Sequence, residues 1–146
     1  MQITIRNLSE ADFDEWQSLW RGYLDFYQTQ LDDAVFKSSF TRMLTPERDT
    51  QNALVAEQDG RLVGLVHFIY HPHNWKIEDV CYLQDLFVDP NLRGGGIGRA
   101  LINAVYAASD VRGVPTVYWL TQDFNHDARK LYDSIASLTP FIKYTR

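Results

Sequence analysis

Residues 86–101, LFVDPNLRGGGIGRAL, carry the strongest structural signal in this chain. They begin as an apolar strand, turn at Asp89 and Pro90, pass through a run of glycines and enter a pattern typical of a helix. Glycines let the backbone approach a ligand closely, and a helix N-terminus supplies unpaired N–H groups and the positive end of the helix dipole. The segment therefore predicts an anion site, most naturally for a phosphate or pyrophosphate.

Two common phosphate motifs do not fit this segment. A P-loop requires a lysine after its glycines, and none follows here. A dinucleotide fingerprint requires Gly-x-Gly-x-x-Gly, but its last position falls on Arg99 when the count starts at Gly94 and on Leu101 when it starts at Gly96. The glycines by themselves are also consistent with a loop that is merely flexible.

Length and composition limit the possible classes of protein. The 146 residues predict one domain over 1–146, and 45% hydrophobic with 23% charged residues exclude a mainly disordered chain. A net charge of −5 argues against a nucleic-acid partner and favours cationic small molecules or basic peptides. The single cysteine, Cys81, excludes an internal disulfide and a cysteine zinc site. With no signal peptide and no apolar run of membrane-spanning length, we expect a cytoplasmic protein with no membrane partner.

Hydrophobic periodicity predicts an α/β domain with the element order β-α-α-β-β-β-α-β-α-β. Asp59-Gly60 between two apolar runs is a strong hairpin signal. Helices are expected over 9–28, from Asp32 or Asp33 to just before Pro46, over 97–109 and over 125–134. Strands are expected near the N-terminus and over 52–57, 62–70, 80–88, 116–120 and 141–144.

Two motifs together resemble one known family. Residues 93–98, RGGGIG, directly after a strand, resemble the Arg/Gln-x-x-Gly-x-Gly/Ala pyrophosphate loop of the GCN5-related N-acetyltransferases, the GNAT family. Residues 125–132, NHDARKLY, are similar to the Asn-x-x-Ala/Ser-x-x-Leu/Phe-Tyr helix of that family. The resemblance covers nearly the whole chain and implies a single GNAT-like domain with a central mixed, mostly antiparallel sheet flanked by helices. Residues 82–88 and 141–144 look like the diamine and histone/polyamine-type branch.

The resemblance implies acetyl-CoA as cosubstrate and no metal. It also implies that the strand before the glycine loop parts from the strand after the following helix, which leaves a slot for the cosubstrate. The cofactor-binding residues that it implies are Leu86, Phe87 and Val88 of the strand, Arg93, Gly94, Gly95, Gly96, Ile97, Gly98 and Arg99 of the loop and helix start, and Asn125 and Ala128.

The resemblance also implies catalytic residues. Tyr132 matches the family's general acid, since a phenol can protonate the departing thiolate; the alternative is that it only packs its helix against the sheet. Gln84 stands where the diamine branch commonly has a glutamate, and a glutamine cannot accept a proton, although it can orient the amine or a water. Asp85 is the neighbouring candidate base, but strand alternation points it to the opposite face unless a bulge intervenes. Asp25, Glu78, Asp79 or a water relay are further candidates.

The resemblance leaves more than one alternative for the acceptor molecule and for its binding residues. Asp25, Tyr27 and Gln28 are implied as substrate-binding residues, with an aromatic core stripe through Tyr23 and Tyr27 as the alternative. We expect acetyl transfer to the primary amine of a polyamine, a diamine or an amino-acid-like molecule by direct attack in a ternary complex. The alternatives are a peptide or protein N-acetyltransferase, acting on lysine or an N-terminus, and a non-catalytic acyl-CoA-binding sensor. The resemblance further implies a homodimer, because members of the family often pair through their C-terminal strands. An apolar edge over 141–144 would also be aggregation-prone if left exposed.

Overall fold

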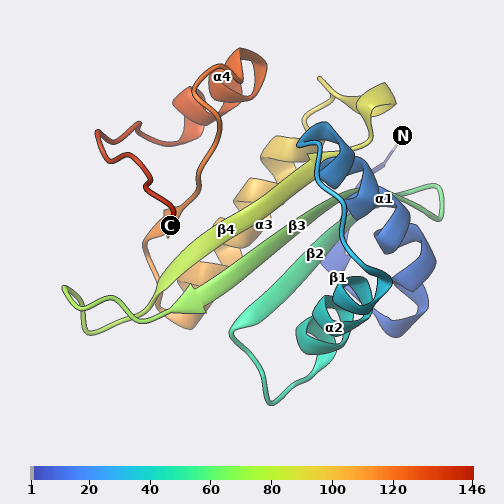
Figure 1. Cartoon of the computed structure of the whole chain (residues 1–146), viewed down its shortest axis with the longest axis horizontal. Coiled ribbons are helices and arrows are strands. Elements are labelled where there is room, and N and C mark those ends of the chain that lie inside the picture. Colours follow the sequence, from blue (N-terminus) through green and yellow to red (C-terminus); the bar gives the residue numbers. More distant parts are fainter. Residues whose placement is uncertain (1) are drawn as a thin grey trace.

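Strand β3 (Arg61–His71) lies at the centre of a five-stranded sheet in a computed structural model that describes residues 2–146 (Figure 1). The other strands are β1 (Thr4–Asn7), β2 (Gln51–Gln58), β4 (Val80–Val88) and β5 (Val117–Tyr118). The strand order is β1-β2-β3-β4-β5, with antiparallel pairing throughout except between β4 and β5, which are parallel. This confirms the mixed, mostly antiparallel sheet. Almost every β3 side chain is buried, since helices cover both faces of the sheet.

Helices lie on both faces of the sheet. The 3-10 turn η1 (Glu10–Asp12) leads into α1 (Phe13–Phe26), which packs with α2 (Asp33–Leu44) on one face. On the other face lies α3 (Ile97–Arg112), which follows the 3-10 turn η2 (Pro90–Leu92) (Figure 1). Helix α4 (His126–Ile135) follows β5 and packs against the same core. A capping box between Ser9 and Asp12 starts the first helical segment.

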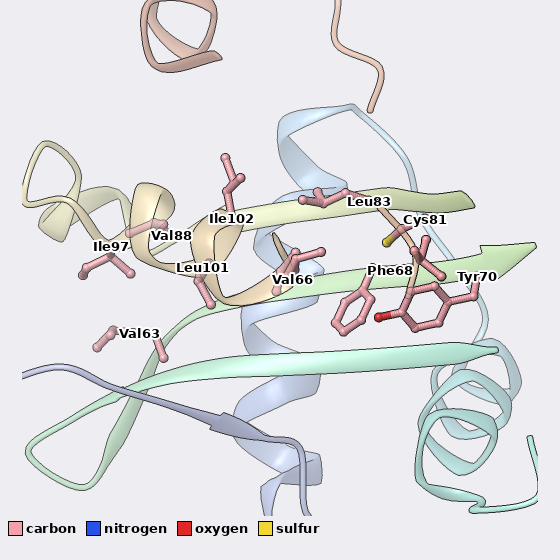
Figure 2. Packing of buried hydrophobic residues seen from close by; sticks show 13 residues of the cluster. Val63, Val66, Phe68, Tyr70, Cys81, Leu83, Val88, Ile97, Leu101 and Ile102 are labelled. Carbon is pink, nitrogen blue, oxygen red and sulfur yellow. The ribbon is translucent and has the colours of Figure 1, made fainter. Parts of the chain in front are cut away.

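Each face of the sheet has its own core. Aromatic side chains dominate the α1/α2 face, where Trp16, Trp20 and Phe36 are buried against Leu65. Aliphatic side chains dominate the α3 face, where Leu101 and Ile102 of α3 lie over Val66 and Leu83 (Figure 2). The two cores pack against β3 and β4 from both sides, and β4 contributes Leu83, Gln84 and Leu86 to the candidate site.

The predicted hairpin between β2 and β3 is confirmed. Asp59 and Gly60 both adopt positive φ, 52° and 76°. Positive φ at both central residues is what the two-residue type I′ turn requires, and it matches the twist of the flanking strands.

Two predicted strands differ from the structure. The strand expected over 141–144 is wrong: residues 137–146 form no strand, and Phe141, Ile142 and Tyr144 are exposed. The strand expected over 116–120 shrinks to Val117–Tyr118. Both differences have one cause, because a strand exists only where a neighbour supplies hydrogen bonds, and β5 leaves β4 after two residue pairs. Among residues 2–146, no helix is both long and apolar enough to cross a membrane.

Candidate active site

A cleft opens where β4 and β5 part. The two strands pair only at Cys81–Val117 and Tyr82–Tyr118, and beyond that point their backbones diverge. The splayed strands implied by the sequence resemblance are therefore present. The cleft is lined by Tyr23 and Tyr27 of α1, Leu83, Gln84 and Leu86 of β4, Ile102 of α3, Trp119 and Leu120 after β5, and Tyr132 of α4.

The glycine loop follows β4 and turns into α3. Gly94 and Gly96 have φ of 84° and 86°, a left-handed conformation that side-chain-bearing residues rarely adopt. Gly96 is the N-cap of α3, so the first N–H groups of a 16-residue helix point out of the loop without helical partners. A Cβ at Gly94 or Gly96 would have nothing within 4 Å, so the space beside the backbone of the loop is open. This geometry fits a pyrophosphate group.

The two arginines beside the loop also brace the fold. Arg93 donates from Nε to the carbonyl oxygen of Val88 at 3.1 Å, and its guanidinium lies 5.2 Å from the ring centroid of Phe87. Arg99 donates to Ser134 Oγ at 2.9 Å and so ties α3 to α4. Both add positive charge near the glycines while their side chains hold the neighbouring elements in place.

The remaining sequence-implied cofactor residues take different positions. Leu86 lines the cleft, whereas Phe87 packs toward α1 and Val88 toward α3. The three residues therefore share the cleft edge of β4 only through their backbones. Asn125 is the N-cap of α4 and donates from Nδ2 to Thr121 Oγ1 at 3.3 Å. Ala128 is half-buried on α4; neither of these two α4 residues is among those lining the cleft.

Tyr132 extends from α4 into the cleft. Its ring packs against Trp119, with centroids 5.4 Å apart and an interplanar angle of 64°. Burial, and then the nearby Tyr27, raise the pKa of Tyr132 to about 12. The phenol therefore keeps its proton across the neutral range, which is the state that a general acid requires.

A β-bulge in β4 places Gln84 and Asp85. The register pairs His67 with Asp85 but Phe68 with Leu83, so Gln84 has no partner on β3. Gln84 is exposed in the cleft, and Asp85 is turned to the α1 side of the sheet and buried. The bulge that the sequence analysis left open is therefore present, and it breaks the alternation of the strand.

A buried chain of hydrogen bonds runs behind the cleft. Trp16 Nε1 donates to His67 Nε2 at 2.9 Å, and His67 Nδ1 lies 2.8 Å from Asp85 Oδ2. Tyr23 also lines the cleft, and its pKa is raised by burial and then by the nearby charge of Asp85. The sequence analysis missed this network. Its signal was His67, a polar residue inside the apolar run 62–70, because such a group needs a buried partner.

The other sequence-implied residues lie outside the cleft lining. Asp25 and Gln28 are exposed at the end of α1, while Tyr27 does line the cleft. Glu78 and Asp79 lie in the loop before β4. Cys81 is fully buried, and burial raises the pKa of its thiol, which disfavours a reactive thiolate. Among residues 2–146, no group of three or more His, Cys, Asp or Glu side chains is arranged to hold a metal.

Comparisons with known proteins agree with this geometry. The model of the acetyltransferase (GNAT) family matches residues 9–136. A D-amino-acid N-acetyltransferase, HPA3 of Saccharomyces cerevisiae, is 34% identical over 146 residues, which cover 99% of this chain and 91% of that protein. A thialysine N-epsilon-acetyltransferase of Bos taurus is 32% identical over 74 residues, covering 51% of this chain and 42% of that protein. The structure of AAC(6')-Iy with a CoA-containing bisubstrate analogue gives a TM-score of 0.87 at 19% identity, covering 100% of this chain and 98% of that chain, which shows a shared fold.

Proposed function

The chain belongs to the GNAT family of acetyltransferases and is an acetyl-CoA-dependent N-acetyltransferase, and from this premise we propose that its acceptor is the primary amine of a small molecule, which is an ammonium group at neutral pH. The family model matches most of the chain, and the similarity to an acetyltransferase extends over nearly its whole length. The chain is therefore an enzyme, and the alternative of a non-catalytic acyl-CoA-binding sensor is dropped.

The observation that carries the proposed acceptor class is the electrostatics of the cleft. Its lining contains no lysine, arginine, aspartate or glutamate side chain, and three of its residues are tyrosines. Behind this lining, the charge of Asp85 helps to raise the pKa of Tyr23 and Tyr27, so its field reaches the cleft wall. Aromatic faces and a nearby buried carboxylate together favour an ammonium group over a neutral or anionic one.

Amino-acid-like amines lead within this class. The relative that matches nearly the whole chain carries the name of an enzyme for D-amino acids, whereas the thialysine enzyme matches about half of it. Polyamines and diamines follow, because they offer the same ammonium group and suit the net charge of −5. A lysine or N-terminal amine of a peptide is the alternative acceptor, which requires the cleft to admit an extended chain.

The acetyl-CoA site that we propose runs along the sheet edge. The glycine loop and the N-terminus of α3 bind the pyrophosphate, and Arg93 and Arg99 add positive charge on its two sides. The backbone of residues 86–88 pairs with the pantetheine arm in the place that β5 vacates, and Asn125 and Ala128 lie beside the arm. The bound cosubstrate supplies an activated acetyl thioester at the position where Gln84 and Tyr132 meet the cleft.

The reaction that we propose is direct attack within a ternary complex. The ammonium group first loses one proton to solvent, and the neutral amine nitrogen then forms a bond to the acetyl carbon while the bond between that carbon and the sulfur breaks. Tyr132 gives its proton to the departing sulfur and recovers one from the nitrogen, so the phenol is unchanged after the cycle. Gln84, exposed in the cleft at the bulge, orients the incoming amine through its amide.

We test this proposal with a thiol-release assay across a panel of amines. The panel contains D- and L-amino acids, polyamines, diamines and a lysine peptide, with acetyl-CoA in each reaction. We expect thiol release with one class of small amines and little with the peptide. Thiol release with the peptide alone would show that the acceptor is a peptide or protein amine. No thiol release with any amine, when CoA binding is confirmed, would contradict the proposed acceptor.

A further inference from the structure

We infer that Tyr82, Tyr118 and His71 form a second subsite for the acceptor, which binds a second ammonium group that does not react. This inference rests on the proposed transfer to a small primary amine and deepens it. It selects acceptors that carry two cationic nitrogens, such as a diamine or a basic amino acid. One nitrogen reacts beside Gln84, and the other is held by the pair of tyrosines.

The three side chains lie on the face of the sheet opposite α3. On β4, Cys81 and Leu83 lie in the core under α3, so Tyr82 between them points to the other face (Figure 2). The residues on either side of Tyr118 also pack against the α3 core, as does the residue before His71. Neither tyrosine belongs to the buried core under α1 and α2, so neither ring is used to build the fold.

Tyr82 and Tyr118 form a stacked pair at the point where β4 and β5 stop pairing. Their ring centroids lie 5.0 Å apart with an interplanar angle of 11°, and 38% of Tyr118 is exposed. They are the last two residues paired between the strands, and the residues that follow them on each strand line the cleft. Aromatic rings that are partly exposed beside a binding cleft attract a cation through their π faces.

His71 fixes the direction of the Tyr118 hydroxyl group. The Nδ1 atom of His71 lies 2.8 Å from the carbonyl oxygen of Pro72, and because a carbonyl oxygen can only accept, Nδ1 carries the proton. In the neutral imidazole Nε2 is then an acceptor, so the Tyr118 hydroxyl donates to it at 2.8 Å. Only the lone pairs of the Tyr118 oxygen remain for a ligand, and the group that binds there must be a hydrogen-bond donor, as an ammonium group is.

The charge on this face of the sheet also favours a cation. Asp85 is buried on the same face beside His67, and among residues 2–146 no salt bridge joins its carboxylate to a lysine or an arginine. Burial, and then the charge of Asp85, raise the pKa of Tyr82, and burial also raises the pKa of Tyr118. Both phenols therefore stay neutral, and the subsite offers two rings, an acceptor oxygen and a nearby negative charge.

The pair of tyrosines lies in the direction that the acceptor has left to it. The proposed path of the pantetheine arm follows residues 86–88, on one side of Gln84 along β4. Tyr82 lies two residues away on the other side, which corresponds to roughly 7 Å along a strand. The two nitrogens of a short linear diamine, or of lysine, span a distance of this size. An acceptor that reacts beside Gln84 can therefore place its second nitrogen at the stacked pair.

The test compares acceptors that differ in the second ammonium group. The pairs are cadaverine with pentylamine and lysine with norleucine, assayed by thiol release at pH 8 in the wild type and in Tyr118→Phe. We expect the wild type to have a kcat/KM about tenfold or more higher for the dication of each pair. In Tyr118→Phe this ratio should fall about fivefold or more, because the ring remains but the acceptor oxygen is lost.

Further variants separate a subsite from a structural role. His71→Leu removes the group that orients the Tyr118 hydroxyl and should lower the ratio, whereas His71→Gln, whose amide oxygen can accept the same hydrogen bond, should restore most of it. Tyr106→Phe removes a hydroxyl that donates to the carbonyl oxygen of Ile135, outside the cleft lining, and should keep the wild-type ratio. A purely structural lesion lowers kcat/KM for both members of a pair alike and leaves their ratio unchanged.

The outcomes are distinct for the two proposals. A wild type that releases no thiol with any small amine contradicts the proposed function. A wild type that acetylates small amines without preferring the dication, or whose preference Tyr118→Phe leaves unchanged, overturns the subsite alone. If Tyr118→Phe does not fold by circular dichroism, the comparison of His71→Leu with His71→Gln decides, since both variants keep the tyrosine ring in place.

Discussion

At the residue scale, Tyr132 combines a position in the cleft with a pKa of about 12, which keeps its hydroxyl protonated under all ordinary conditions. We expect Tyr132→Phe to lower kcat by roughly 10²- to 10⁴-fold, because the leaving sulfur loses its proton donor. The affinity for CoA should change little, since the ring remains packed on Trp119. Steady-state kinetics and calorimetry measure the two quantities separately.

The matched control for this phenol is Tyr106→Phe. Tyr106 lies on α3, outside the cleft lining, and donates from its hydroxyl to the carbonyl oxygen of Ile135 at 3.1 Å. The free energy of unfolding of Tyr106→Phe should fall by about 1 kcal/mol, while its kcat should stay at the wild-type value. Equal kcat values for Tyr132→Phe and the wild type would remove this phenol from the mechanism.

The pair of Arg6 and Asp12 supports a pH-dependent contribution to stability. The two contacts between them measure 2.8 and 2.9 Å, and the bond from Arg6 is the main reason that the pKa of Asp12 is lowered. Because the folded carboxyl has a lower pKa than the unfolded one, near about 3.9, the pair stabilises the fold above that pH and loses this effect as the pH falls further. We expect Asp12→Asn to cost about 2 kcal/mol at pH 7.

Urea unfolding at pH 7 and at pH 3 measures this effect. The difference in free energy of unfolding between the wild type and Asp12→Asn should be smaller at pH 3 than at pH 7. Asp14→Asn, exposed in the same helical turn, should stay within about 0.5 kcal/mol of the wild type at both. A deficit for Asp12→Asn that is constant with pH would show that lost packing, rather than charge, causes it.

At the scale of a single element, α3 has a left-handed glycine at each end: Gly96 at its N-cap with φ of 86° and Gly113 at its C-cap with φ of 79°. Replacing either glycine with alanine should lower the free energy of unfolding by about 1–2 kcal/mol, because alanine is strained at positive φ. Only Gly96→Ala should also weaken CoA binding, since the proposed pyrophosphate site lies at that end of the helix.

Calorimetric titration of CoA into both alanine variants separates the two effects. We expect Gly113→Ala to bind like the wild type and Gly96→Ala to lose about tenfold or more in Kd. If the two variants bind CoA equally well, the pyrophosphate does not sit on the N-terminus of α3.

At the scale of the whole molecule, the tail after α4 exposes four large apolar side chains. Leu138, Phe141, Ile142 and Tyr144 are 76–88% exposed within one chain. Large apolar side chains exposed along one short segment are typical of an interaction surface, and we propose that a second copy of the chain covers it. Light scattering with size-exclusion chromatography should give a dimer, and Phe141→Asp combined with Ile142→Asp should give a monomer.

The control for this assembly uses a comparable side chain elsewhere on the surface. Val111 on α3 is 91% exposed, and Val111→Asp should leave the dimer intact. A monomeric wild type at micromolar concentration would contradict the proposed dimer without affecting the proposed chemistry.

The sequence by itself was sufficient for the elements whose signals are local. The hairpin at Asp59-Gly60 and the glycine loop before α3 each depend on neighbours within a few residues, and each was predicted at its observed place. The two motifs at 93–98 and 125–132 were enough to indicate the family, because their spacing reflects one compact site.

Only the tertiary structure decided what depends on distant partners. The predicted strand at 141–144 is absent because strand pairing is non-local, and its apolar pattern has no neighbour within the chain. Asp85 faces α1 because a bulge opposite β3 shifts the register, and no local pattern around Gln84 indicates it. The link from Trp16 through His67 to Asp85 joins three elements that are far apart in sequence, and only burial forces their polar groups to satisfy one another.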